Sequence, residues 1–416
     1  MYDWAVSVYS LVITSSIFPI YYSNVAVNKD GGDMINFLGF SIKNSVLYSY
    51  SLTFTFLIVA FMNPILSAIA DYSGRKKAFM QFFCFVGSFA CASLFFFQTE
   101  TTTLAIGLFI LAGIGYSGSF VFYNSYLPEI ATEEKFDRIS AKGFSMGYIG
   151  SVILLIFNLL MIMKPDLFGN ISAGLASRLS FLSVGIWWLL FAQYTFYYLP
   201  KDQPRKDHQK NWIFNGFKEL NKVFKQLNDL PQVKKFLLSF LFYNMGVQTT
   251  MYVATVFAEK ELHLPSTNLI ATVLILQLIA IPGAYLASFL SSKIGNIKTI
   301  IIEVVVWIGI CIFAYFVNNG NEFYALAAIV GLVMGGIQSI SRSTYGKLIP
   351  KETSDTASYF SFYEFVYSIS IVLGTFFYGF IEAWTGSARN SVLVLGLFFF
   401  ISLFMLYRLR RNVISK

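Results

Sequence analysis

Residues 51–78, SLTFTFLIVAFMNPILSAIADYSGRKKA, decide the fold of this chain. They form an apolar stretch that ends in a short turn with a glycine and several basic residues. As a helix, such a stretch can cross the apolar core of a bilayer, which is about 30 Å thick. Residues 271–299, ATVLILQLIAIPGAYLASFLSSKIGNIKT, repeat the same plan, with a proline inside the span and a glycine in the turn. The chain is therefore predicted to cross a membrane and to contain two similar halves.

The composition of the whole chain also indicates a membrane protein. Of its 416 residues, 56% are apolar and only 12% are charged, and the mean hydropathy is +0.62. A soluble domain carries roughly a quarter charged residues, so this chain cannot form a water-exposed surface of the usual kind. The same figures exclude a disordered chain and a small disulfide-linked scaffold.

No pattern typical of an enzyme or of a metal site occurs in the sequence. The three cysteines lie inside apolar runs without the spacing of metal ligands, and the two histidines lie in polar stretches. The sequence has no phosphate-binding loop of the type G-x-x-x-x-G-K-[ST], so ATP hydrolysis by this chain is not supported. We therefore expect no enzymatic activity, no cofactor and no metal.

Apolar runs of membrane-spanning length recur along the sequence. A window of about 19 residues finds six runs, then a polar and lysine-rich stretch, then six more. We therefore predict an all-α polytopic membrane protein with 12 transmembrane helices in two six-helix parallel repeats. The predicted spans are 4–27, 44–70, 78–98, 103–127, 142–164, 178–199, 236–258, 267–292, 299–317, 323–346, 357–383 and 390–408.

Basic residues are distributed unevenly between the two sides of these spans. If both termini are cytoplasmic, 23 of the 30 lysine and arginine residues lie in cytoplasmic segments and only 6 lie in outside segments. This bias follows the positive-inside rule. It also explains the net charge of +8 without any binding to nucleic acid.

The polar stretch between the two sets of spans divides the chain into three parts. We predict an N-terminal six-helix half at 1–199, a cytoplasmic linker at 200–235 and a C-terminal six-helix half at 236–416. Between Pro204 and Pro231, apolar residues recur at helical spacing. This pattern predicts an amphipathic helix on the cytoplasmic membrane face, with its lysines near anionic headgroups, or else a docking site for a partner.

A second pair of similar segments follows the fourth span of each half. Residues 124–140, NSYLPEIATEEKFDRIS, occupy the same place in the first half as residues 342–358, RSTYGKLIPKETSDTAS, in the second. Parallel repeats of six spans are typical of one class of secondary transporter, in which the substrate is held near the membrane midplane between the halves. A channel or a membrane enzyme is not expected to show this repeat.

The turn after the second span resembles the loop motif of the major facilitator superfamily, G-x-x-x-D-R-x-G-R-R. Asp71 and Arg75, on either side of the flexible Gly74, are then expected to form a charge cluster against the eleventh span that closes the cytoplasmic side. The alternative is that these charges only set the topology. The residues that match the motif are Asp71, Gly74, Arg75 and Lys76, whereas Ser67 and Tyr72 replace its first glycine and first arginine.

Three further parts of the sequence resemble the vacuole-effluxer-like family within this superfamily. They are Tyr2-Asp3-Trp4-Ala5 with FPIYYSNVA, the block YNSYLPEIA…DRISAKGFSMGYIGS, and the block GGIQSISRSTYGKLIP…YFSFYEF. The family includes fungal autophagy-related vacuolar amino-acid exporters and many bacterial relatives of unassigned substrate. The resemblance implies the major facilitator fold, in which the first, fourth, seventh and tenth spans line the substrate cavity.

Polar residues in the cavity-lining spans are candidates for substrate binding, because polar groups inside a membrane span are costly. Asn244, Gln248 and Tyr252 recur at four-residue intervals and so share one helix face. The alternatives are hydrogen bonds between helices and, for the tyrosines, ordinary packing. The full set of substrate-binding candidates is Tyr22, Tyr123, Asn124, Tyr148, Asn244, Gln248, Tyr252, Gln338 and Arg342.

Arg342 and Glu364 are the charged residues that most need an explanation, because both fall inside predicted spans. A hydrogen-bonded pair of the two would remove the cost of two isolated charges. The pair is expected to be structural or to break as an inner gate opens; the alternative is that Arg342 binds a substrate carboxylate. Glu364 is the best candidate for a group that carries a coupled proton. The coupling or gating candidates are Asp3, Asp71, Gly74, Arg75, Arg342 and Glu364.

Further expectations concern two acids and three prolines. Asp3 opens the first span and is expected to pair with a basic residue of the inner gate; the alternative is that it carries a proton. Glu303 lies near the start of the ninth span and is expected to reach the membrane interface. Pro19, Pro64 and Pro282 interrupt helical hydrogen bonding and are expected to introduce bends.

The predicted function is secondary active transport of a small polar organic solute, such as an amino acid or related metabolite, by alternating access with proton coupling. The alternatives are a multidrug or toxic-compound exporter of the same fold, and a membrane sensor or scaffold that does not transport. The expected partners are a small-molecule substrate, the lipid bilayer and protons, with no nucleic acid, and the protein is expected to be monomeric. The expected location is the bacterial inner (plasma) membrane, with both termini cytoplasmic.

Overall fold

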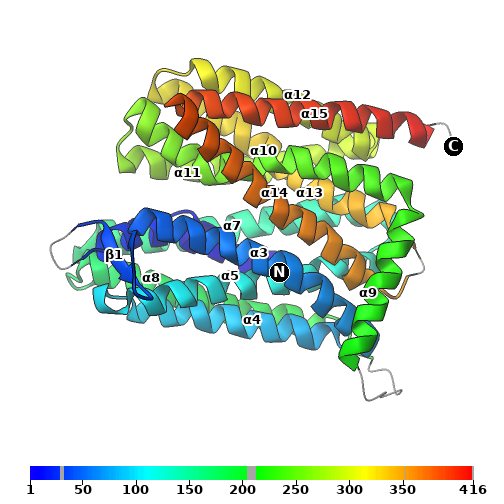
Figure 1. Cartoon of the computed structure of the whole chain (residues 1–416), viewed down its shortest axis with the longest axis horizontal. Helices are drawn as coiled ribbons and strands as arrows, with labels where there is room; N and C mark the ends of the chain where they lie inside the picture. The colour runs from blue at the N-terminus through cyan, green and yellow to red at the C-terminus, as the bar shows by residue number, and fades with distance from the viewer. Residues whose placement is uncertain (29–31, 204–211, 352, 415–416) are drawn as a thin grey trace. The chain divides into compact units, whose positions relative to one another are not determined.

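The computed structural model describes residues 1–28, 32–203, 212–351 and 353–414, and nearly all of this part of the chain is helical (Figure 1). The first span comprises α1, a π-helical turn and α2: Tyr2–Val8, Tyr9–Thr14 and Ile17–Val25. The other helices are α3 (Asn44–Ser73), α4 (Lys76–Ser93), α5 (Thr102–Ser125), α6 (Leu127–Ile130), α7 (Phe136–Met163), α8 (Ala173–Tyr198), α9 (Trp212–Asn228), α10 (Pro231–Leu262), α11 (Ser266–Ile294), α12 (Asn296–Phe316), α13 (Gly320–Leu348), α14 (Thr356–Thr385) and α15 (Ala388–Ile414).

Eleven helical segments of the described residues are long and apolar enough to cross a membrane. They coincide with every predicted span except the seventh. The seventh predicted span lies in α10, whose 32 residues are long enough to cross a bilayer. Asn244 and Gln248, in the middle of α10, lower its mean hydropathy. The predicted order of spans is otherwise found along the chain.

The chain forms two compact units that do not coincide with the predicted sequence halves. The difference arises at one end of three N-terminal helices. The last part of α3, the end of α5 and the first part of α7 belong to the same unit as the C-terminal helices. Unit 1 contains Met1–Val59, Arg75–Tyr123 and Met146–Gln203, and unit 2 contains Ala60–Gly74, Asn124–Ser145 and Pro204–Lys416.

Within unit 1, small residues and indole rings bring helices together. A Cβ at Gly87 of α4 would overlap the ring of Trp188 of α8, so the indole lies directly on the glycine. Trp4 and Trp187 stack with ring centroids 5.5 Å apart. The indole N–H of Trp187 also donates to the carbonyl oxygen of Trp4 at 3.1 Å. These contacts fix α1 and α4 against α8.

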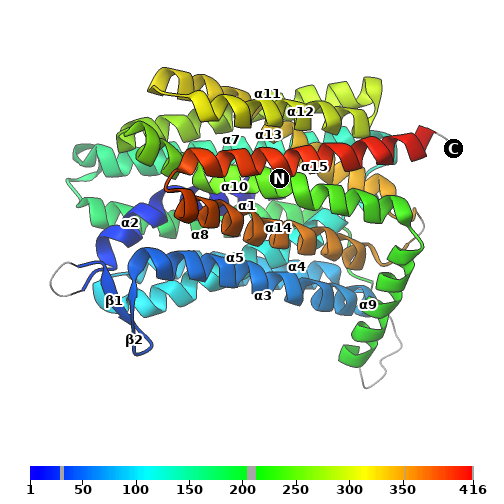
Figure 2. The ribbon, with the colours of Figure 1, turned by 45° about the horizontal axis from the view of Figure 1, so that its top comes forward.

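Within unit 2, α11 and α13 pack against each other at the closest approach that backbones allow. A Cβ at Gly335 of α13 would overlap the carbonyl group of Ala280, and one at Gly283 of α11 would overlap that of Leu332. Small residues at such crossings are typical of membrane helices, which associate through close van der Waals contact. Figure 2 shows α11, α12, α13 and α15 running side by side.

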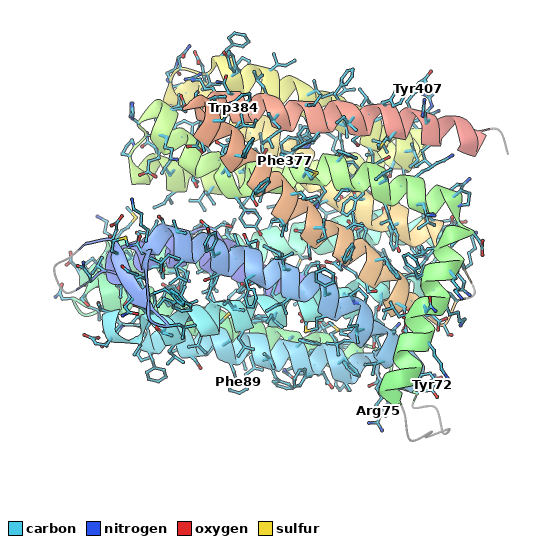
Figure 3. All side chains as sticks on the ribbon, in the orientation of Figure 1. Tyr72, Arg75, Phe89, Phe377, Trp384 and Tyr407 are labelled. Atoms are coloured by element: carbon cyan, nitrogen blue, oxygen red, sulfur yellow. The ribbon has the colours of Figure 1, made fainter. Side chains whose placement is uncertain are left out.

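The outer faces of both units carry exposed aromatic residues. In α4 of unit 1, Phe82 is 60% and Phe89 is 61% exposed; in α14 of unit 2, Phe376 is 62% and Trp384 is 78% exposed. Figure 3 shows Phe89 projecting from α4. Faces of this kind are expected where a helix contacts lipid rather than water.

A β-hairpin between α2 and α3 was not predicted. Strands β1 (Met34–Phe37) and β2 (Phe40–Lys43) pair antiparallel around Leu38 and Gly39. Both turn residues have positive φ, 51° and 89°, which is the geometry of a tight two-residue hairpin. Glycine favours this geometry, whereas a leucine adopts it rarely.

The linker forms a helix, as predicted, but its inner face packs on the protein. Val223 and Leu227 of α9 are buried. Lys222 forms an ion pair with Asp355, just before α14, with Nζ and Oδ2 3.2 Å apart. The Tyr359 hydroxyl of α14 donates to Oε1 of Gln226 at 3.1 Å. The helix α9 is therefore attached to the start of α14.

Candidate functional site

The two repeat segments, 124–140 and 342–358, contact each other within unit 2. As the residue numbers rise in one segment, those of its partners fall in the other, so the segments pair in antiparallel fashion. Carboxylates come from the first segment and their cationic or hydroxyl partners from the second. The contacts are Asp137–Lys347 at 2.8 Å, Glu133–Lys351 at 2.6 Å and Glu129–Thr356 at 3.1 Å.

Arg342 of α13 lies at the buried end of this pairing and is only 4% exposed. Its Nε donates to Oγ of Ser140 at 2.9 Å, and its Nη2 donates to the carbonyl oxygen of Ser140 at 3.0 Å. Its Nη1 donates to Oδ1 of Asn124 at 3.1 Å. The guanidinium also lies over the ring of Phe144, 4.4 Å from its centroid. The charge of Arg342 is therefore held by residues at both ends of segment 124–140.

Asn124 connects Arg342 to Glu364. Its side-chain nitrogen donates to Oε1 of Glu364 at 2.7 Å, while its oxygen accepts from Arg342. All three side chains are buried. The sequence predicted a pair of Arg342 and Glu364, and the structure places an amide between the two charges. Such an arrangement satisfies buried charges that would be costly if either stood alone.

Asp137 is a second buried centre of this pairing and was not among the residues predicted from the sequence. Besides Lys347, its carboxylate accepts from Oγ of Ser291 at 2.9 Å and from Nδ2 of Asn296 at 2.7 Å. Lys347 also donates to Oδ1 of Asn296 at 2.9 Å. The residue lies in the first turn of α7, and its partners come from the end of α11, the start of α12 and the end of α13. The signal that could have found it is the excess of acids in segment 124–140, set against the lysines of segment 342–358.

Asp71 lies at the start of α14, as the loop motif implied. Its Oδ2 accepts from the backbone N–H of Ser358 at 2.7 Å and from the Ser358 hydroxyl at 2.8 Å. The first backbone N–H groups of a helix have no partner within the helix, and the helix dipole favours a negative charge there. Gly74 has a φ of +67°, which suits a glycine in the turn that follows. Arg75 is exposed, and its side chain points outward in Figure 3.

The polar stripe of α10 is bonded to α14 in this structure. Nδ2 of Asn244 donates to Oγ of Ser370 at 2.5 Å, and Nε2 of Gln248 donates to Oδ1 of Asn244 at 3.3 Å. The Tyr367 hydroxyl donates to Oε1 of Gln248 at 3.1 Å. These contacts match the interpretation of the stripe as hydrogen bonds between helices. The neighbouring candidates Tyr252 and Gln338 are half-buried.

The remaining candidates lie in unit 1. The Tyr22 hydroxyl donates to the carbonyl oxygen of Asn44 at 3.0 Å, so this tyrosine joins the end of the first span to α3. Tyr123 donates to the carboxylate of Asp3, which is 1% exposed. The structure thus gives a tyrosine as a partner of Asp3, where a basic residue was expected. Tyr148 is buried.

Comparison with known proteins identifies the family. Residues 1–413 match the family described as Vacuole effluxer Atg22 like. The chain belongs to this family. The uncharacterized MFS-type transporter YxiO of Bacillus subtilis (strain 168) is 30% identical over 414 residues, which cover 98% of this chain and 92% of YxiO. Autophagy-related protein 22 of Kluyveromyces lactis is 26% identical over 391 residues, which cover 86% of this chain and 77% of that protein.

Solved structures give the fold of this Atg22-like chain. The transporter FucP in its outward conformation matches with a TM-score of 0.69 and 13% identity, covering 98% of this chain and 96% of FucP. The proton:xylose symporter XylE matches with a TM-score of 0.71 and 13% identity, covering 98% and 93%. The chain is therefore a multi-pass membrane protein with the fold of the major facilitator superfamily, and its relative YxiO is described as a transporter of that type. The predicted fold class and family are confirmed.

One expectation about this Atg22-like chain is wrong. Glu303 does not reach the membrane interface, because it is only 6% exposed. It lies against Gly336 of α13, where a Cβ would overlap its carboxylate. The glycine leaves the space that the side chain occupies. Counting residues from the end of the span suggested an exposed acid, but the tight packing of α12 on α13 encloses it.

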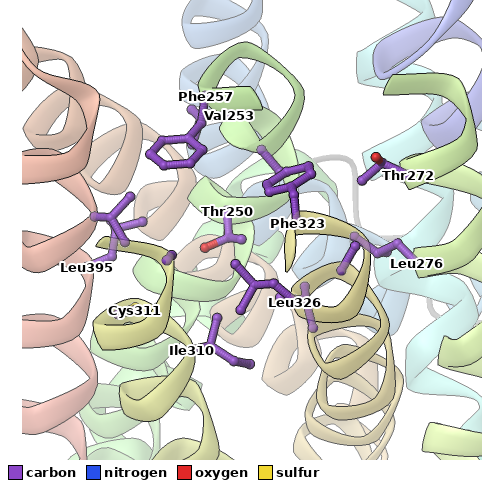
Figure 4. A pocket seen from close by; sticks show the side chains of 15 residues that line it. Thr250, Val253, Phe257, Thr272, Leu276, Ile310, Cys311, Phe323, Leu326 and Leu395 are labelled. Carbon is purple, nitrogen blue, oxygen red and sulfur yellow. The ribbon is translucent and has the colours of Figure 1, made fainter. Parts of the chain in front are cut away.

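The C-terminal helices enclose a small apolar cavity of about 60 Å³ (Figure 4). Its lining includes Phe257 of α10, Leu276 of α11, Cys311 of α12 and Leu326 of α13. Pockets that hold drug-sized molecules are roughly 300–1,000 Å³, so this cavity is too small for a molecule of that size. It gives no support to the alternative of a multidrug exporter.

Proposed function

We propose that this Atg22-like protein is a secondary active transporter that moves a small polar organic solute, an amino acid or related metabolite, by alternating access. Segments 124–140 and 342–358 form its gate on the cytoplasmic side. The observation that carries the proposal is the position of Arg342, which bonds to both the first and the last residue of segment 124–140. A single buried cation thus joins the matching segments of the two sequence repeats.

The exposure of the paired residues supports reversible opening. Side-chain exposure is 21% for Lys347 and 8% for Asp137, but 78% for Lys351 and 44% for Glu133. An ion pair that is already hydrated costs little to break, because water replaces the lost contact. The gate can therefore separate from its exposed edge inward, and Arg342 is the last contact to break.

Asp71 and α9 give the same gate two further attachments. Asp71 binds the backbone at the start of α14, and Lys222 of α9 binds Asp355 one residue before that helix. An opening movement of α14 has to break both contacts. The proposed role of Asp71 and Gly74 as gating residues agrees with this position, whereas the exposed Arg75 is proposed to set topology.

The proposed solute class rests on the family and on the polar residues of α10 and α14. The family description names a vacuole effluxer. Asn244, Gln248 and Tyr367 supply amide and phenol groups that suit a polar or zwitterionic solute. They bind it once the hydrogen bonds among these side chains are replaced by hydrogen bonds to the solute. In the present structure they bond to one another, so solute binding requires α10 and α14 to move apart.

Glu364 is proposed as the proton-coupling group. Its partner Asn124 has both a donor and an acceptor, so the amide can bond to a charged carboxylate and to a neutral carboxyl. Gain of a proton at Glu364 removes a negative charge beside Arg342. This change weakens the network that closes the gate, and in this way links protonation to opening.

Replacement of Glu364 by glutamine tests the coupling. Proteoliposomes with the Glu364→Gln protein are expected to lose uptake of a mixture of ¹⁴C-labelled L-amino acids driven by a pH gradient. Counterflow exchange of the same mixture is expected to persist, because glutamine keeps the hydrogen bond to Asn124. Glu382→Gln, on the same helix but paired with Lys260, is the matched control and is expected to keep both activities. Unchanged pH-driven uptake by Glu364→Gln contradicts the coupling role.

We further propose that the protein is a monomer in a bacterial inner membrane with both termini in the cytoplasm. The charge bias of the loops and the bacterial relative YxiO support this placement. In this orientation the basic turn after α3, the helix α9 and the repeat segments all face the cytoplasm, as a gate on that side requires.

A further inference from the structure

The first span of unit 1 is not a continuous α-helix. The chain leaves α1 at Val8, passes through a π-helical turn from Tyr9 to Thr14, and resumes as α2 at Ile17. Figure 2 labels α1 and α2 as separate segments. The interruption precedes Pro19, where the sequence predicted a bend. Single π-helical turns inside α-helices occur frequently at functional sites.

The interruption leaves polar groups without a partner. Ser16, just before α2, has φ −128° and ψ −77°, outside the helical region, and its side chain does not cap the helix. Thr14 is 6% exposed, and neither its Oγ1 nor Oγ of Ser16 has a hydrogen-bond partner among the described residues. Each such buried hydroxyl is costly and calls for an explanation.

Other threonines of the chain show what is unusual at Thr14. In α3, the hydroxyl of Thr55 donates to the carbonyl oxygen of Ser51, four residues earlier, at 2.8 Å. That bond satisfies the hydroxyl inside a regular helix. The Thr14 hydroxyl makes no such bond. The backbone carbonyl oxygen of Thr14 accepts from the Tyr48 hydroxyl at 3.0 Å. The interruption therefore leaves the Thr14 hydroxyl available for a ligand.

The two helix ends that meet here have opposite partial charge. The last carbonyl groups of a helical segment carry a partial negative charge, and the first N–H groups of the next carry a partial positive charge. Here the segment that ends at Thr14 and the nine-residue helix that begins at Ile17 are separated by only two serines. In membrane transporters, interrupted helices bind cations at carbonyl ends and carboxylates at N-terminal ends.

We propose that Thr14–Ser16 is the subsite that binds the ammonium and carboxylate groups of an amino acid. The ammonium group donates to the Thr14 hydroxyl and to the nearby carbonyl groups of the π-helical turn. The carboxylate accepts from the Ser16 hydroxyl and from the N–H groups at the start of α2. The proposal rests on the proposed function, because it takes the solute to be an amino acid. It assigns the binding of that solute to the hydroxyls of Thr14 and Ser16, which were not among the substrate-binding candidates.

Counterflow kinetics with matched variants test the subsite. The probe is the ¹⁴C-labelled L-amino acid mixture, with glycine as an unlabelled competitor that carries both charged groups and no side chain. Thr14→Val and Ser16→Ala are expected to raise KM by about tenfold, the loss of one hydrogen bond to a charged group, with little change in maximal rate. Thr14→Ser keeps the hydroxyl and is expected to restore the KM. Thr55→Val removes a satisfied hydroxyl and is expected to leave the KM unchanged.

Three results overturn the subsite. If Thr14→Val and Ser16→Ala keep the KM of the parent protein while that protein exchanges amino acids, the subsite is wrong and the proposed function stands. If the parent protein exchanges none of the mixture, the amino-acid class and the subsite fail together. If Thr14→Val lowers the melting temperature more than Thr55→Val does, the Thr14 hydroxyl has a structural partner and is not free for a solute.

Discussion

Segments 124–140 and 342–358 hold the same place in the two halves of the sequence, yet they contribute opposite charges to their contact. The first supplies the carboxylates of Glu133 and Asp137, and the second supplies the cations of Lys351 and Lys347. An internal repeat places equivalent elements near one another. Divergence in charge then allows the equivalent elements to bind each other instead of repelling. The repeat thus accounts for where the two segments meet, and the differences in charge within the repeat account for why they bind.

The same comparison predicts a gradient of interaction strength along the contact. Its charged contacts run from the buried Arg342, through the buried Asp137 and the partly buried Lys347, to the exposed Glu133 and Lys351. Coulomb interactions weaken as water surrounds a pair, because the effective dielectric constant rises. Three sets of substitutions test this order.

The largest effect is expected for Arg342→Ala. This change leaves Glu364 buried without its nearby cation, and removing one partner from a buried charge pair costs about 3–5 kcal/mol in the free energy of unfolding. Urea unfolding of the detergent-solubilised protein measures the loss. The double variant Arg342→Met/Glu364→Met removes both charges and is expected to recover most of it. Equal stability of Arg342→Ala and the parent protein contradicts the proposed role of this residue.

An intermediate effect is expected for the Asp137–Lys347 pair. Asp137→Asn and Lys347→Met each remove a charge from a partly buried cluster, so their effects are not expected to add. A double-mutant cycle is expected to give a coupling energy of about 1–2 kcal/mol. If the pair belongs to the proposed gate, the variants that lose the coupling energy between the two residues are also expected to change the transport rate. Strictly additive effects show that the two residues act independently.

The smallest effect is expected at the exposed edge. Lys351→Ala removes an ion pair whose lysine side chain is 78% exposed, and such pairs contribute little because water and salt screen them. No measurable change in melting temperature is expected at physiological salt. A destabilisation as large as that of Asp137→Asn refutes the gradient.

Much of the fold could be predicted because its signals are local. Length, hydropathy and loop charge are properties of single segments, and they located the spans and the basic turn. The π-helical turn at Tyr9–Thr14 was not predicted, because no residue within it forbids an α-helix and only packing selects the wider turn. The prediction for Glu303 failed for the same reason, since its burial depends on Gly336 of a different helix.

The candidate site was predicted in part. Arg342 and Glu364 were found because a charge inside a span is conspicuous in any sequence. Asn124 was found as a polar residue of a cavity-lining span, but its bridging position was not, since it depends on two distant helices. Asp137 lies at a helix start, where an acid is ordinary, and its partners Ser291 and Asn296 lie more than 150 residues away in the chain.

The contact between Asp71 and α14 has a consequence for how the proposed gate tolerates mutation. Part of what Asp71 binds is the backbone N–H of Ser358, and every amino acid except proline supplies that group. Substitutions at the start of α14 therefore leave this part of the contact intact, whereas a change at Asp71 removes it entirely. Genetic drift is expected to alter one partner freely and to be restricted at the other, so the two sides of the gate evolve under unequal constraint.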